Sequence, residues 1–105
     1  MEWIYLIIAT LFEIGWPFSM KMASLGNHRI LWIIFAIIAM ALSGVFLYYA
    51  QKHIPMGTAY AIWTGLGAAC TFIIGVYLFH DAINLMRILG VLLVIFGVIL
   101  LKFGN

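Results

Sequence analysis

Four long apolar runs make up most of this 105-residue chain, and they limit its possible folds more than any other feature. They cover approximately residues 3–20, 30–50, 56–79 and 85–103. A helix of about 17 to 25 mainly apolar residues crosses a bilayer and satisfies its own backbone polar groups there. Charged residues form 8% of the chain, against about a quarter in soluble domains. We therefore predict an all-α membrane protein with a single four-helix transmembrane domain over residues 1–105.

The first and last runs are the least typical of the four. The first has a secretory signal peptide as its alternative, but Glu13 interrupts its apolar stretch, and neither a cleavage-type pair of small residues nor a soluble domain follows. The uncharged part of the last run covers only residues 88–101. Arg87 and Lys102 at its two ends reach outward to water and make up the missing length. We expect both runs to span the membrane.

Glu13 is the carboxylate that these spans would bury. An acid inside hydrocarbon is costly unless it is paired or protonated, so intramembrane acids usually serve the passage of protons or cations. Helical spacing places Thr10 and Pro17 on the same face as Glu13, with Trp16 beside them. Pro17 lacks the amide hydrogen that would bond the Glu13 carbonyl, which allows a bend at the acid. Its alternative is an ordinary membrane-helix proline.

The third run carries a stripe that combines aromatic rings, hydroxyls and glycine at helical spacing. Its members are Tyr60, Trp63, Thr64, Gly67 and Thr71. Aromatic faces together with a carboxylate suit an organic or planar cation, because a cation over a ring gains about 0.5 to 2 kcal/mol. Aromatic residues near a membrane surface are more often anchors, but Trp63 lies well inside its run. Ser43, in the second run, is relevant only if it faces the acid.

Glycines recur every seven residues in the fourth run, at Gly90, Gly97 and Gly104, with apolar residues between them. Small residues at this spacing let two helices approach closely. Nothing polar follows the same line, so it does not indicate a pore. We expect Gly90 and Gly97 to pack helices together in a dimer.

Basic residues are divided almost evenly between the two sides of a four-span chain. Lys21, Arg29 and Arg87 would face Lys52 and Lys102, three against two. Short-loop Lys and Arg set membrane orientation only when one side has a clear excess. We therefore expect insertion in both orientations, and two opposed copies would supply the inverted repeats that transporter sites use. The alternative is a single orientation fixed by a bias too small to read from five residues.

The chain shows no pattern typical of an enzyme or a cofactor site. It has no phosphate-binding glycine loop, no His and Cys cluster at metal spacing, and no nucleophile with a base and an orienting partner. His28, His53 and His80 fall in the connectors. The net charge of +2 is ordinary for basic membrane flanks. We expect no enzymatic activity, no cofactor, no metal and no nucleic-acid partner.

Taken together, these residues resemble the small multidrug resistance transporters over essentially the whole chain. The resemblance rests on Glu13 in the first of four short helices, on the glycine-spaced fourth helix, and on the third-run residues Gly57, Ala59, Tyr60, Ala61, Trp63 and Gly65. Trp16, together with Thr58 and Thr64, is similar to the guanidinium exporter branch. The quaternary-ammonium exporters typically have glycine at the position of Trp16.

The resemblance implies an antiparallel homodimer in the bacterial inner membrane that exports guanidinium and small guanidinyl cations in exchange for protons. It implies that Glu13 binds both substrate and proton. The residues implied to line the site are Thr10, Trp16, Ser43, Tyr60 and Trp63. The chain departs from the branch at Thr10, where glycine is usual, and at Pro17, where a small residue is usual.

Three other functions remain open at this stage. A proton-coupled multidrug exporter of the same fold would prefer quaternary ammonium or lipophilic cations. A dual-topology ion channel would conduct passively, although a central acid argues against an anion path. A subunit of a heteromeric pair would fail alone, although such subunits tend to have strong and opposite charge biases.

Overall fold

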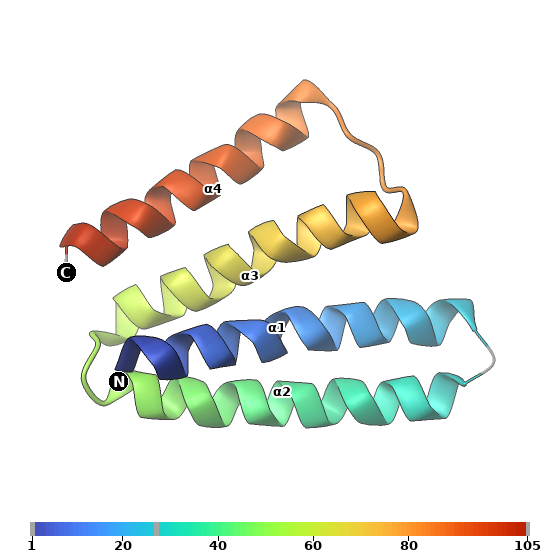
Figure 1. Ribbon diagram of the computed structural model, residues 1–105, viewed down its shortest axis with the longest axis horizontal. Helices are drawn as coiled ribbons and strands as arrows, with labels where there is room; N and C mark the ends of the chain where they lie inside the picture. The colour runs from blue at the N-terminus through green and yellow to red at the C-terminus, as the bar shows by residue number, and fades with distance from the viewer. Residues whose placement is uncertain (1, 27, 105) are drawn as a thin grey trace.

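The computed structural model describes residues 2–26 and 28–104, which form four helices joined by short connectors (Figure 1). The helices are α1 (Glu2–Leu25), α2 (Arg29–Gln51), α3 (Met56–Phe79) and α4 (Leu85–Gly104). Each is long and apolar enough to cross a membrane. The prediction of an all-α chain with four membrane-length helices is confirmed.

The first helix continues beyond the expected end at residue 20 and reaches Leu25. Residues 21–25 contain neither glycine nor proline, so nothing in their backbone preferences stops the helix before Gly26. The bilayer sets only a minimum length for a span. Lys21 therefore lies on the last turns of α1 rather than in a connector.

The helices pack unequally. Figure 1 shows α1 and α2 lying antiparallel along their whole length, with α3 beside α1 and α4 diverging from the rest. Among the described residues, the backbone of α4 approaches that of α3 alone. Small residues allow the close α1–α2 approach, as where a Cβ on Gly15 would lie 3.7 Å from that of Ala39. The site is therefore built mainly from α1, α2 and α3.

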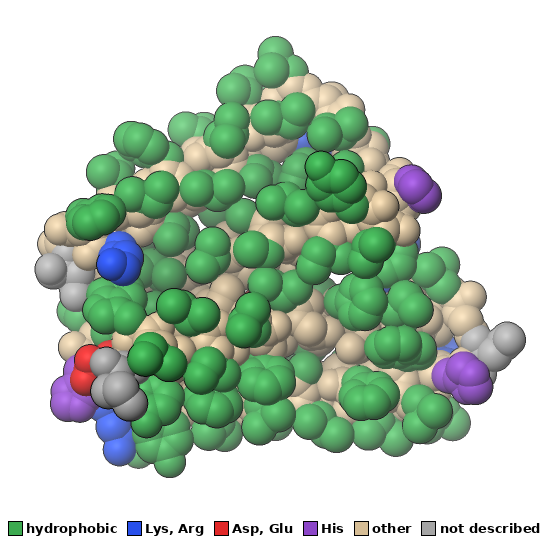
Figure 2. Space-filling model, in the orientation of Figure 1, with side chains coloured by type: hydrophobic (Ala, Val, Ile, Leu, Met, Phe, Trp, Pro, Cys, Tyr) green, Lys and Arg blue, Asp and Glu red, His purple; other side chains and the backbone are tan. Residues whose placement is uncertain are grey.

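The buried side chains concentrate at the end of the bundle where the α2–α3 connector lies. The cluster consists of Leu6, Ala50, Ile54, Ala59 and Ile62. No described residue of α4 is buried, although the Lys102 ammonium lies 5.2 Å from the centre of the Trp3 ring. Apolar side chains cover most of the visible face in Figure 2, as expected of a surface solvated by lipid.

The connector between α3 and α4 folds back over the end of α3. His80 has a left-handed backbone with φ of 56°, and the Asp81 amide donates a hydrogen bond of 3.0 Å to the Gly75 carbonyl. The Asp81 carboxylate lies where a side chain on Gly75 would collide with it. At the start of α4, Asn84 Oδ1 accepts a 2.9 Å hydrogen bond from the Arg87 amide. The amide bond to Gly75 and the missing Cβ at that position hold Asp81 beside α1 and α3.

Candidate functional site

Glu13 lies in the middle of α1 with its side chain partly buried. The Trp16 indole Nε1 donates a 2.6 Å hydrogen bond to Glu13 Oε1. A separation of three residues brings two side chains together on one helix face, so α1 alone supplies this contact. In the part of the chain that the structure describes, no hydrogen bond is seen to Oε2. The second oxygen therefore keeps its acceptor capacity for a ligand.

Helix α3 passes Glu13 at Gly67, which is buried. A Cβ built on Gly67 would lie 2.8 Å from Glu13 Cγ, closer than two carbon atoms approach. The side chain of the acid thus occupies the space that any other residue at position 67 would fill. The glycine places the α3 backbone directly against the acid.

Ser43 joins three helices one turn away from Glu13. Its hydroxyl donates a 2.7 Å hydrogen bond to the carbonyl of Ala9 on α1 and accepts one of 2.7 Å from Trp63 Nε1 on α3. The serine side chain is 1% exposed. Ala9 stands four residues before Glu13, so Ser43 holds Trp63 against the same stretch of α1 that carries the acid.

Tyr60 and Thr10 take no direct part in these contacts within one chain. The Tyr60 side chain is 54% exposed, and its ring centre lies 5.4 Å from that of Trp63. Thr10 is buried and donates a 2.9 Å hydrogen bond to the Leu6 carbonyl of its own helix. The structure therefore joins Glu13 to Trp16 and Trp63 to Ser43, while the Tyr60 ring faces outward.

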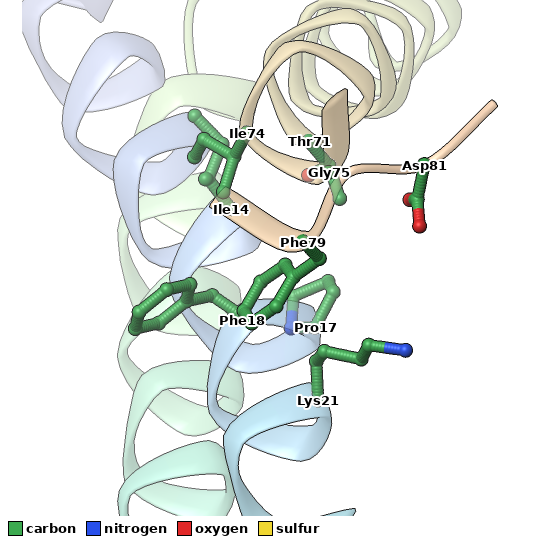
Figure 3. Close-up of a pocket in the computed structure, with 9 residues that line it drawn as sticks. All are labelled: Ile14, Pro17, Phe18, Lys21, Thr71, Ile74, Gly75, Phe79 and Asp81. Atoms are coloured by element: carbon green, nitrogen blue, oxygen red, sulfur yellow. The ribbon is translucent and has the colours of Figure 1, made fainter. Parts of the chain in front are cut away.

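A cavity of about 200 Å³ lies between α1 and α3 next to this site (Figure 3). Ile14 and Pro17 line it from α1, and Thr71 lines it from α3, four residues after the glycine that meets Glu13. Figure 3 shows Lys21 and Asp81 together on one side of the cavity. The cavity thus extends from the charged residues Lys21 and Asp81 to Ile14, the residue after the acid in the sequence.

Two of the α4 glycines lie apart from the site, beside open hollows between α3 and α4. Cβ atoms added to Gly90 and Gly97 would meet no atom within 4 Å. The packing of α4 on α3 instead uses Gly65, whose added Cβ would be 3.0 Å from Val98 Cγ2. Within the described chain, no side chain or backbone atom fills the space in front of these two glycines.

Sequence reasoning placed Gly67 on a stripe with Trp63 but did not identify it as the neighbour of Glu13. The signal was the glycine itself, because a glycine inside a helix often marks close approach of another group. Nothing in the sequence indicated that the Ala9 carbonyl accepts the Ser43 hydrogen bond, since every residue has a carbonyl. Asp81 also went unnoticed, because its place depends on how the connector folds.

Known proteins resemble this chain over its full length. The family model described as Small Multidrug Resistance protein matches residues 1–94. A guanidinium exporter from Proteus vulgaris is 43% identical over 105 residues, which cover all of both chains. A guanidinium exporter from Escherichia coli K12 is 39% identical over all of this chain and 99% of its own length. The four membrane-length helices and these bacterial relatives place the chain in the bacterial inner membrane as a multi-pass protein. The chain belongs to the small multidrug resistance family.

Proposed function

We propose that two copies of the chain pair in opposite orientations and export guanidinium and small guanidinyl cations in exchange for protons, by alternating access. The observation that carries the proposal is the Glu13 carboxylate, placed mid-membrane, bonded to Trp16 through one oxygen only. The names of the relatives support the substrate, since they are called guanidinium exporters. These relatives also favour transport over enzymatic catalysis.

The chemistry of the site suits exchange of one cation for protons. A carboxylate holds either a proton or a share of a bound cation's charge, so the two ligands compete for Glu13. Guanidinium is planar and presents its donors in a fixed fork that matches a carboxylate oxygen pair. Two opposed Glu13 side chains would therefore bind one cation and release up to two protons.

Two features of the chain support the paired arrangement. The basic residues are divided three against two, which favours both orientations in the membrane. On α4, an added Cβ at Gly90 or Gly97 would meet no atom within 4 Å, and these small residues allow a close partner helix. Pairing through α4 leaves α1 and α3 of both copies available to the site.

The decisive experiment is uptake of radiolabelled guanidinium by the purified protein in liposomes, with and without a pH gradient. We expect uptake that the gradient drives and that an ionophore collapsing the gradient abolishes. Tetraphenylphosphonium, a cation substituted on every side, serves as the comparison substrate. Equal or better transport of tetraphenylphosphonium would move the protein to the multidrug exporters, and uptake indifferent to the gradient would indicate a channel.

A further inference from the structure

The geometry of the contact between Gly67 and Glu13 distinguishes two possible roles for the glycine. It could allow α1 and α3 to approach closely, or it could leave room for the side chain of Glu13. A Cβ on Gly67 would lie 2.8 Å from Glu13 Cγ but 3.6 Å from Glu13 Cβ and 4.0 Å from Glu13 Cδ. Carbon atoms in good contact are about 3.5 to 4.0 Å apart. An added methyl group therefore overlaps with the Cγ atom alone.

This pattern means that the two helices already stand far enough apart for alanine. If α1 and α3 needed the glycine simply to approach, the overlap would involve backbone atoms or the Cβ of Glu13. Instead, only the flexible arm of Glu13 from Cγ outward must move. A side chain relieves such an overlap by rotating to another staggered rotamer, about 120° away.

Rotation of the arm would cost the hydrogen bond to Trp16. The 2.6 Å bond from Trp16 Nε1 to Glu13 Oε1 requires the arm in its present rotamer. Trp16 stands one turn along the same helix, so it does not follow when Glu13 swings away. Gly67 on α3 thus leaves room for the Cγ of Glu13, and the Trp16 indole on α1 bonds its carboxylate oxygen.

We propose that Gly67 is a positioning residue whose missing side chain forms a socket for the arm of Glu13. The socket keeps the carboxylate in the rotamer that Trp16 bonds and that presents the second oxygen to the cation. This inference rests on the proposed function, because it assigns the glycine a part in cation binding by Glu13. It acts through the acid and does not itself touch the cation.

The first test compares Gly67→Ala with Gly65→Ala, two residues earlier on the same helix. Alanine at position 65 would meet the end of the Val98 side chain on α4, at 3.0 Å, and leaves Glu13 untouched. Guanidinium uptake should fall about tenfold or more in Gly67→Ala, since misplacing a binding group by an ångström is costly. Gly65→Ala should lose clearly less, and both variants should elute as folded protein.

The second test observes the indole directly. The Trp16 indole N–H resonance is assigned by its loss in Trp16→Phe, and its shift reports the hydrogen bond to Glu13. It should move in Gly67→Ala and remain in place in Gly65→Ala. A role in helix packing alone would not move this signal.

The third test is a double-mutant cycle between Gly67→Ala and Trp16→Phe. If both changes release the same arm, each alone and the two together should cost about tenfold, rather than the hundredfold of independent effects. Additive losses, an unmoved indole signal, or a Gly67→Ala protein that no longer folds would each overturn the proposal. Failure of the unmodified protein to carry guanidinium would instead reject the proposed function, and the indole shift would still decide the socket.

Discussion

The buried polar side chains of these helices are hydrogen-bonded, mostly to backbone carbonyls. No buried side-chain nitrogen or oxygen lacks a hydrogen-bond partner in residues 2–26 and 28–104. Thr10 and Ser19 bond to carbonyls of their own helix, and Ser43 links Ala9 with Trp63. The hydrocarbon core of the membrane explains why these groups are all bonded, because an unsatisfied polar group there costs several kcal/mol. The free oxygen of the partly buried Glu13 stands out against this background.

At the residue scale, Glu13→Gln should abolish guanidinium uptake driven by a pH gradient. The amide is nearly isosteric and still accepts the Trp16 hydrogen bond, but it neither ionises nor holds a cation's charge. Uptake into liposomes measures the effect, and circular dichroism checks the fold. Glu2→Gln, in the first turn of α1 and far from Glu13, is the matched control and should transport normally. Persistent gradient-driven uptake by Glu13→Gln would remove the acid from the mechanism.

Ser43→Ala should loosen the junction of three helices. The change leaves the Trp63 indole without its acceptor, and such interhelical hydrogen bonds are worth about 1 kcal/mol in membranes. Thermal unfolding in detergent should show a lower midpoint than for the unmodified protein. Ser24→Ala, which removes only an exposed bond within α1, should leave the midpoint unchanged. Equal midpoints for the two variants would show that the Ser43 junction contributes nothing.

At the scale of elements, the four helices differ in how much of their surface the chain covers. The α1–α2 pair is in contact along its length, whereas α4 has no buried residue among those described. Val94 and Val98 of α4 meet Gly65 of α3, while Gly90 and Gly97 border open hollows beside this contact. The pattern is typical of a helix that packs against another molecule through its uncovered side.

Gly97→Leu should therefore weaken association of two copies while leaving each chain folded. The Cβ of the leucine has free space, since no atom of the chain lies within 4 Å of that position, but the larger side chain would hold a close partner helix away. Cross-linking in native membranes measures the dimer fraction, which should fall at least severalfold. Leu92→Ala, about 200° around α4 from Gly90, is the control and should not change it. An unchanged dimer in Gly97→Leu would place the interface on another helix.

Contacts within one helix were predictable from the sequence, and contacts between helices were not. The pairing of Glu13 with Trp16 follows from a spacing of three residues on α1. The contact of Gly67 with Glu13 depends on how far α3 slides along α1, and no periodicity within either helix contains that register. For the same reason, the sequence placed Tyr60 beside Trp63 but did not show that its ring faces outward.

At the scale of the whole molecule, the two ends of the bundle carry nearly equal basic charge. Lys21, Arg29 and Arg87 belong to one end and Lys52 and Lys102 to the other, since the helices alternate in direction (Figure 1). Length and apolarity of four runs were enough to predict the spans. For the proposed pairing of two copies, the sequence of one chain offers only the nearly even division of basic residues and the glycines of α4.

The charge balance leads to a prediction about topology. His28→Lys with His80→Lys raises the basic count of one end from three to five, against two at the other, and should fix a single orientation. Alone, this variant should lose guanidinium transport. Co-expression with the opposite variant, Gln51→Lys with His53→Lys, should restore it. Full activity of the first variant by itself would mean that parallel copies or single chains are the working unit.

Because part of the α4 surface is uncovered, the concentration of the protein in the membrane should affect its activity. A helix that finds its remaining contacts on another molecule is stabilised in proportion to how often such molecules meet. Extra lipid lowers that frequency without altering any bond inside a chain. The activity of each copy should therefore depend on how crowded the membrane is with its own kind, so that the amount synthesised sets the rate per molecule as well as the total.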